Sequence, residues 1–347
     1  MSTSIRRYFY LDFLKVIASF SVILIHVAAT KFYVLDVSSL DWKILNVFNS
    51  LTRFSVPAFV MITGVFVLDP NRMIETKTFF KKYIFKTILI YIVVSSLYTI
   101  LSFVMFGFDY TPFELIKQFV YRVIDGPPHL TYLYTLVGLY LASPFLRKLF
   151  TKDNRMLLLF ILFSFTMNLL VHLKNITTID TIELLINRTG FNLTTGFVFY
   201  LSLGYYLHNH KISKTWTYLI YLVGILGLIS TYVLSDFASN ASGNAVEIHY
   251  GYLNTNIMVV STAVFLFTKN VLHEKNISSS IDKLFTTLSK NNLFVYLFHP
   301  FVIILLDRFD VFSLNIPILP YFIVLSVVVY GISLIPILIY NRLKSSK

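Results

Sequence analysis

The stretch that decides the fold is residues 9–29, FYLDFLKVIASFSVILIHVAA. It is apolar except for a few polar side chains, of which Asp12, Lys15 and His26 are ionisable. Its length suits a helix that crosses a bilayer, since about 20 residues at 1.5 Å rise span the hydrocarbon core. Two arginines precede it, as in a secretory signal. The internal charges and the lack of a small-residue cleavage site indicate a retained membrane helix instead.

The rest of the chain repeats this character. Of its 347 residues, 56% are hydrophobic and only 13% charged, too few charges to cover the surface of a soluble domain of this size. We expect an all-α membrane protein of about ten transmembrane helices that forms a single integral-membrane domain over residues 1–347. The predicted spans are 9–29, 44–68, 84–106, 130–150, 156–173, 190–207, 216–235, 251–268, 291–306 and 317–340. The longest outward loops are then 107–129, 174–189 and 236–250.

The distribution of basic residues predicts the orientation. Of the 29 Lys and Arg residues, 20 fall on the side of the two termini and 7 on the other, with Lys15 and Arg53 inside helices. The positive-inside rule therefore places the N and C termini in the cytoplasm. The net charge of +12 is explained by topology, and we expect no nucleic-acid partner.

A narrow polar stripe runs along the first predicted helix. At 100° per residue, Asp12, Lys15 and His26 lie within about 60° of one another, with Ser19 between them. Lys15 and His26 are about 16 Å apart along the axis, so the stripe reaches from the inner toward the outer half of the membrane. One reading is structural: Lys15 reaches the inner headgroups and pairs with Asp12, and His26 bonds a neighbouring helix. The other is that the stripe lines a functional cavity.

Three more ionisable residues fall at the outer half of the predicted bundle. Arg53 is expected at the depth of His26 and needs an anionic or carbonyl partner there, which a reacting acyl group could supply. His129 stands at the entrance to the fourth helix, and His299 precedes a proline in the ninth. Each has a structural explanation when taken singly, and their convergence favours a site.

Several kinds of chemistry are excluded. The chain has no Cys, hence no thiol nucleophile and no thiolate metal site. His208-Asn209-His210 has a metal-like spacing but lies in a cytoplasmic loop without carboxylates, so we interpret it as a solvated turn and expect no metal. Neither a phosphate-binding Gly-rich loop nor a Gly-x-Ser-x-Gly elbow is present, which argues against an ATPase and a common serine hydrolase.

A set of short motifs in a fixed order resembles the acyltransferase 3 family of bacterial membrane enzymes. The first is Leu11-Asp12-Phe13-Leu14-Lys15 followed by ten residues and His26, which is similar to the family's Arg/Lys-x10-His signature. The others are Arg53-Phe54-Ser55-Val56-Pro57, Thr63-Gly64, His129-Leu130-Thr131-Tyr132, Pro144-Phe145-Leu146-Arg147, Leu203-Gly204-Tyr205-Tyr206, Leu288-Ser289 and Tyr296-Leu297-Phe298-His299-Pro300.

This resemblance implies an O-acyltransferase, with acyl-CoA, chiefly acetyl-CoA, as the donor substrate and no permanently bound cofactor. The acceptor is implied to be a hydroxyl of a cell-surface or lipid-linked glycan. His26, Lys15 and Arg53 correspond to catalytic positions, and Asp12, His129, Tyr132 and His299 to substrate-binding ones. Lys81, Lys82, Lys86 and Arg147 form the basic rim expected to bind the donor phosphates.

The chain departs from the family pattern at two places. Thr131 stands where the family often has Trp. The Arg-x-x-Arg expected at the start of the third helix is Tyr83-Ile84-Phe85-Lys86 here, so only the second basic position is kept, with Lys81 and Lys82 nearby.

Other classes of function stay open at this point. A polysaccharide or lipid-linked sugar exporter and a non-catalytic subunit of a glycan synthase would have similar aromatic-rich helices. The resemblance implies a bacterial plasma-membrane protein surrounded by lipid. Homo-oligomerisation and membership of a glycan-synthesis complex are open.

Overall fold

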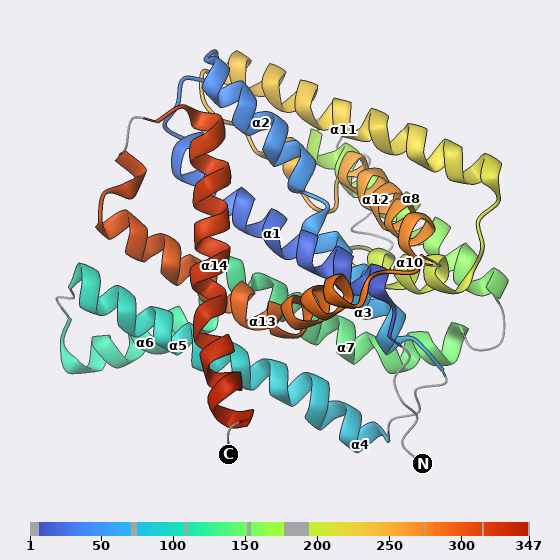
Figure 1. Cartoon of the computed structure of the whole chain (residues 1–347), viewed down its shortest axis with the longest axis horizontal. Helices are drawn as coiled ribbons and strands as arrows, with labels where there is room; N and C mark the ends of the chain where they lie inside the picture. The colour runs from blue at the N-terminus through green and yellow to red at the C-terminus, as the bar shows by residue number, and fades with distance from the viewer. Residues whose placement is uncertain are drawn as a thin grey trace. The chain divides into compact units, whose positions relative to one another are not determined.

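The computed structural model describes residues 7–70, 75–107, 110–150, 154–176, 194–273, 275–313 and 316–345. Every element among these residues is a helix, which confirms the all-α expectation (Figure 1). In chain order the elements are α1 (Phe9–Phe32), α2 (Leu40–Thr52), α3 (Ser55–Val67), α4 (Thr76–Phe79), η1 (Phe80–Phe85), α5 (Lys86–Phe106), α6 (Pro112–Asp125), η2 (Pro128–Leu130), α7 (Thr131–Phe150), α8 (Asn154–Ile176), α10 (Val198–Asn209), α11 (Lys214–Ser242), η3 (Ile248–Tyr250), α12 (Thr255–Leu272), α13 (Ser279–Arg308), η4 (Val311–Ser313) and α14 (Ile318–Ser345).

Eight helical segments in the described part of the chain are long and apolar enough to cross a membrane. They are Phe9–Phe32, Leu40–Val67, Lys77–Met105, Arg155–Lys174, Lys214–Ser242, Ile248–Leu272, Ser279–Arg308 and Ile318–Lys344. Each overlaps one of the predicted spans. The protein is therefore a multi-pass membrane protein by the length and composition of its helices.

The two other predicted spans correspond to helices outside this set. The span 130–150 is α7, which has Pro144 inside it and Arg147 and Lys148 in its last turn. The span 190–207 corresponds to α10, which has only 12 residues, and residues 190–193 lie outside the described part. The count of ten and the cytoplasmic termini stay predictions. The loop predicted at 174–189, together with Arg6, Arg72, Lys152, Arg188 and Lys347, also lies wholly or largely outside the described residues.

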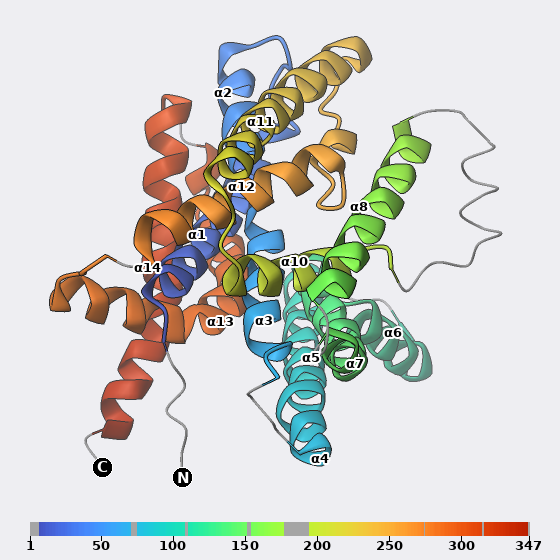
Figure 2. The same ribbon diagram turned by 90° about the vertical axis from the view of Figure 1, so that its right-hand side faces the viewer.

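The chain divides into two compact units, one of residues 1–65 and 158–347 and one of residues 66–157. In the larger unit α1 is central and packs against α2, α12, α13 and α14, as both views show (Figures 1 and 2). Its core is a cluster of buried apolar side chains from α1, α2, α13 and α14. The helix with the polar stripe is thereby enclosed by protein over much of its surface.

The C-terminal end of α1 packs against α2 through an aromatic contact. The Trp42 ring is fully buried, stacks on Phe32 at 5.1 Å between ring centroids, and its indole N–H donates to the Phe32 carbonyl at 3.1 Å. That carbonyl is one of the last in α1 and has no partner within the helix. The side chain of Ser39 accepts from the backbone N–H of Trp42 and so caps α2.

Helix α11 shows the pattern of a lipid-facing helix. Its buried residues are all small, namely Gly224, Gly227, Thr231, Ser235 and Ser239, spaced three or four apart. Its large apolar residues are exposed. Small side chains let the backbones of α11 and α12 approach closely, which is how helices associate where no water drives them together.

Two glycines make a close contact between α3 and α10. A Cβ added at Gly64 would overlap the Leu201 carbonyl, and a Cβ at Gly204 would overlap the Met61 carbonyl. Both glycines belong to the short motifs noted in the sequence. The sequence has glycine at both positions because there is no room for a side chain, not because glycine takes part in chemistry.

The smaller unit contains α4, η1, α5, α6, η2 and α7. Helix α6 occupies the segment predicted as an outward loop at 107–129. Thr111 and Glu114 form a capping box at its start, and the hydrogen bonds from Thr111 lower the pKa of the Glu114 carboxyl. None of its residues is buried, and it lies against α5 (Figure 1). The alternation of polar and apolar residues that gives this helix two faces also keeps it below the hydropathy of a span.

Candidate active site

The polar stripe lies on α1, which is one unbroken helix. Lys15 and His26 both lie within Phe9–Phe32, about three turns and 16 Å apart along the axis. Both side chains are half-buried. Neither forms a hydrogen bond or ion pair with any residue that the structure describes. The helix thus presents an ammonium group and an imidazole along one face, without hydrogen bonds or ion pairs to the described residues.

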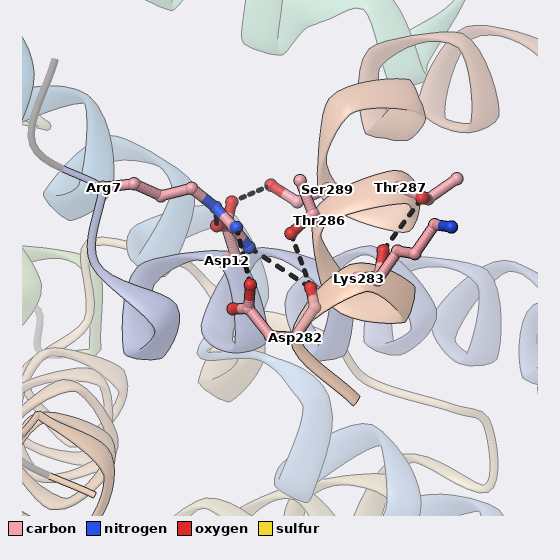
Figure 3. Close-up of polar contacts among 7 residues, drawn as sticks. All are labelled: Arg7, Asp12, Asp282, Lys283, Thr286, Thr287 and Ser289. Atoms are coloured by element: carbon pink, nitrogen blue, oxygen red, sulfur yellow. Dashed lines mark hydrogen bonds and ion pairs between the residues drawn. The ribbon is translucent and has the colours of Figure 1, made fainter. Parts of the chain in front are cut away.

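Asp12 is held by two other residues, so the predicted pairing of Asp12 with Lys15 is wrong. Figure 3 shows the Arg7 guanidinium bonded to Asp12, with Nε 2.5 Å from Oδ2. The Ser289 hydroxyl donates to the other carboxylate oxygen, also at 2.5 Å. Arg7 further reaches Asp282 on α13, at 3.0 Å to its carboxylate. A charged guanidinium competes better than an ammonium for a carboxylate because it offers several donors in a fixed plane.

His26 meets His299 across the contact between α1 and α13. The ring centroids are 5.2 Å apart and the planes are inclined by 43°. The His299 side chain is fully buried, and its Nδ1 lies 3.2 Å from the Val295 carbonyl of its own helix. The Tyr296 ring also packs against His299, with 6.2 Å between the ring centroids. The structure therefore brings together two of the predicted site histidines, one half-buried and one buried.

Arg53 stands at the break between α2 and α3, where it is the C-cap of α2. Its side chain is only 11% exposed. Its guanidinium lies 3.4 Å from Glu247 and 4.5 Å from the centroid of the Tyr250 ring. Its Nε is buried without a hydrogen-bond partner among the described residues. The guanidinium is also within electrostatic range of the His26 ring.

The sequence reasoning missed Glu247. The sequence predicts an anionic or carbonyl partner for Arg53, such as a reacting acyl group, and in the structure a carboxylate of the chain itself is a partner. The predicted outward loop 236–250 has two acidic residues, Asp236 and Glu247. Nothing in the spacing linked Glu247 to Arg53, which is 194 residues away. Arg53 still has an unsatisfied donor, because the ion pair uses Nη2 only.

The predicted substrate-binding residues of the smaller unit lie around η2. His129 belongs to η2, and its ring meets Tyr98 of α5 edge-on at 4.9 Å. Tyr132 lies in the first turn of α7 and is half-buried. Gly126 precedes them at φ 69°, and a Cβ there would overlap the Tyr91 hydroxyl. The Gly-Pro-Pro turn therefore sets the position of His129 in its own unit.

The predicted donor-binding lysines lie in a distinctive helical segment. Lys81 and Lys82 belong to the π-helical η1, and Lys86 begins α5. All three are exposed. The wider turn inserts an extra residue into an otherwise continuous helix, and such turns are frequent at functional sites. This basic surface fits the expectation of an anionic ligand, which stays a prediction.

Arg147 has a structural task in the same unit. Its Nε donates to the Val67 carbonyl at 3.0 Å, its Nη2 contacts the same oxygen, and the guanidinium lies 5.8 Å from the Phe79 ring. Val67 is the last residue of α3, so Arg147 satisfies a terminal carbonyl. Part of its donor capacity is used in this way, which weakens its assignment to the donor rim.

His208 is not in a solvated turn, contrary to our interpretation. Its Nδ1 is 2.5 Å from the Tyr10 hydroxyl, and Tyr10 is fully buried. Next to it the Lys269 ammonium bonds to the carbonyls of Leu207, His208 and His210, at 3.0 Å for the last two. Sequence gave no sign of this contact because Lys269 comes from α12, about 60 residues further on. In the described part of the chain no group of acidic or histidine side chains could hold a metal.

These observations define a class. The larger unit is a bundle of membrane-length helices with an ionisable stripe, a histidine pair and a buried arginine, and ionisable groups at such positions mark a candidate functional site. The chain belongs to the acyltransferase 3 family, because the sequence profile described as an acyltransferase domain matches residues 8–338. Comparison with curated proteins and with solved structures gives no match.

Proposed function

We propose that this protein is a membrane-embedded O-acyltransferase that moves an acyl group, acetyl first of all, from cytoplasmic acyl-CoA to a hydroxyl of a cell-surface or lipid-linked glycan. Membership of the family supports acyl transfer by a membrane protein. The donor, the acceptor and the bacterial plasma membrane are parts of the proposal.

The observation that carries the proposal is the position of His26. It lies on the same helical face as Lys15, beside His299, and within electrostatic range of Arg53. A histidine suits proton removal near neutral pH because its ordinary pKa is about 6.5. Four ionisable side chains around one helix are costly in a membrane unless they serve a purpose.

In the proposed reaction the His26 imidazole removes the proton of the acceptor hydroxyl. The hydroxyl oxygen attacks the thioester carbon, and the negative charge passes to the carbonyl oxygen. Arg53, whose Nε has a free donor, is the candidate to stabilise that oxyanion. The carbon–sulfur bond then breaks, and the His26 proton goes to the CoA thiolate. The products are the acyl ester and free CoA.

The donor is proposed to bind from the cytoplasmic side. CoA phosphates are too highly charged for the hydrocarbon core, whereas its pantetheine arm is slim and weakly polar. The exposed Lys81, Lys82 and Lys86 are the candidates to bind those phosphates. Lys15 of the larger unit is the candidate to contact the pantetheine arm.

The test is release of CoA by purified protein in detergent or nanodiscs. Acetyl-CoA is supplied with an isolated surface glycan, and free thiol is measured with a thiol reagent. Since the chain has no Cys, the reagent reports only CoA. We expect thiol release that depends on the glycan, with acetyl ester on the glycan by mass spectrometry. Absence of both products with every acceptor tried would favour the exporter or the non-catalytic subunit.

A further inference from the structure

A cluster of four polar residues surrounds the inner end of the α1 stripe: Arg7, Asp12, Asp282 and Ser289 (Figure 3). Arg7 precedes α1, and Asp282 and Ser289 lie on α13, almost two turns apart. Arg7 joins the two helices because its guanidinium bonds Asp12 at 2.5 Å and Asp282 at 3.0 Å. Ser289 is buried and donates to Asp12 from the other side.

Both oxygens of Asp12 are occupied by these contacts. Arg7 takes Oδ2 and Ser289 takes Oδ1. These two contacts use about half of the roughly four acceptor sites of the carboxylate and fix its orientation toward Arg7 and Ser289. Asp12 is therefore oriented by the protein, and its contact with a substrate stays a prediction.

Lys15 lies one turn further along the helix. The i,i+3 spacing allows an ion pair with Asp12, and in a membrane such a pair is strongly favoured because the environment has a low dielectric constant. Asp12 attracts the Lys15 charge, yet no ion pair forms between them. Lys15 has no hydrogen bond or ion pair with a residue in the described part of the chain.

We infer that Arg7 and Ser289 are positioning residues that hold Asp12 away from Lys15 and so keep the Lys15 ammonium available to the acyl donor. The inference rests on the proposed function. It assigns Lys15 to the carbonyl and amide oxygens of the donor arm, since an ammonium group donates and these oxygens accept. Asp12 and Asp282 compensate the two cations, which makes the half-buried charge tolerable.

The decisive test compares Arg7→Gln with the double variant Arg7→Gln/Asp12→Asn. In Arg7→Gln the freed carboxylate captures Lys15, and the KM for acetyl-CoA rises about tenfold, the size expected for one lost hydrogen bond to a charged group. In the double variant the carboxylate is gone, Lys15 is available again, and the KM returns toward the wild-type value. A merely structural Arg7 predicts the opposite, because a second substitution in a weakened contact adds damage.

Three further variants complete the design. Arg7→Lys keeps a cation near Asp12 but replaces the planar guanidinium by an ammonium, so it should raise the KM less than Arg7→Gln does. Ser289→Ala keeps the ion pair and frees one oxygen, so it should raise the KM less than Arg7→Gln and be rescued by Asp12→Asn. Lys283→Ala is the matched control, since Lys283 follows Asp282 on α13, is exposed, and its side chain forms no ion pair with a described residue.

The outcomes separate the inference from the proposed function. If wild-type protein shows no transfer from acetyl-CoA, the proposed function is wrong, and the inference, which depends on it, is rejected as well. If wild-type protein is active and Arg7→Gln matches it, or Asp12→Asn fails to rescue both Arg7→Gln and Ser289→Ala, the inference alone is overturned. Gel filtration in detergent confirms that each variant is folded before its KM is measured.

Discussion

At the scale of single residues, His26 of α1 and His299 of α13 contact each other, with 5.2 Å between their ring centroids. The two rings differ in what surrounds them. His299 is fully buried and lies by a carbonyl of its own helix, whereas His26 is half-buried and without a hydrogen bond to a described residue. A general base needs access to the acceptor, so the more exposed ring suits that role and the buried one suits orientation.

We expect His26→Ala to lower acyl transfer by roughly 10²- to 10⁴-fold, the usual contribution of a general base. The measurement is CoA release by purified protein, together with acetyl esters on surface glycans of cells that carry the variant, the wild type or no copy. His210→Ala serves as the control, because that ring stacks on Tyr206 at 4.3 Å in α10 and has no proposed part in the reaction. Full activity in His26→Ala would remove His26 from the mechanism.

Arg53 illustrates how one side chain can have both a structural and a chemical part. Its ion pair with Glu247 and its contact with Tyr250 compensate a charge that a membrane disfavours. Glu247 is 48% exposed, so the pair adds little stability by itself. The donor at Nε remains, and it is this atom that the proposed mechanism uses.

At the scale of elements, the contact between α3 and α10 depends on two glycines. We expect Gly64→Ala to destabilise the protein by about 1–3 kcal/mol, the usual cost of forcing an extra methyl group into a packed contact. The reason is that the new Cβ would overlap the Leu201 carbonyl, a backbone atom that cannot rotate away. Thermal unfolding in detergent measures the effect.

Gly331→Ala is the matched control for this substitution. Gly331 lies inside α14, and a Cβ there has no neighbour within 4 Å. Alanine should be neutral or stabilising by about 0.5–1 kcal/mol, since it restricts the unfolded chain more than glycine does. Equal unfolding temperatures for the two variants would contradict the close packing of α3 and α10.

The end of α10 depends on a lysine from another helix. Lys269 donates to three carbonyl groups at the C-terminal end of α10, where the helix leaves carbonyls unsatisfied. We expect Lys269→Met to cost about 2–3 kcal/mol, because the hydrogen bonds come from a charged donor. Lys275→Met, at an exposed position that follows α12, should leave the unfolding temperature unchanged.

At the scale of the whole molecule, the natural absence of cysteine permits a direct test of orientation. We expect Asn244→Cys, before α12, to react with a membrane-impermeant maleimide added to intact cells. Lys275→Cys, after α12, should react only once the membrane is opened. Both positions are exposed. The opposite pattern would reverse the predicted orientation, with the termini outside.

The sequence by itself determined the class of fold and the helix that carries the site. Apolar length predicts membrane helices because backbone groups in lipid must bond within a helix, and eight such helices are found in the described residues. The stripe of α1 was equally predictable, since Lys15 and His26 share one helix and its 3.6-residue period relates their faces. The order of the motifs indicated the family that the comparison confirms.

Tertiary structure alone decided which charges pair. Asp12 binds Arg7 and Ser289 instead of Lys15, Arg53 has Glu247 as its counter-ion, and Lys269 caps a helix about 60 residues earlier in the chain. Helical period governs only contacts within one helix. Contacts between helices depend on how the helices pack, and the spacing of residues along the chain does not encode that packing.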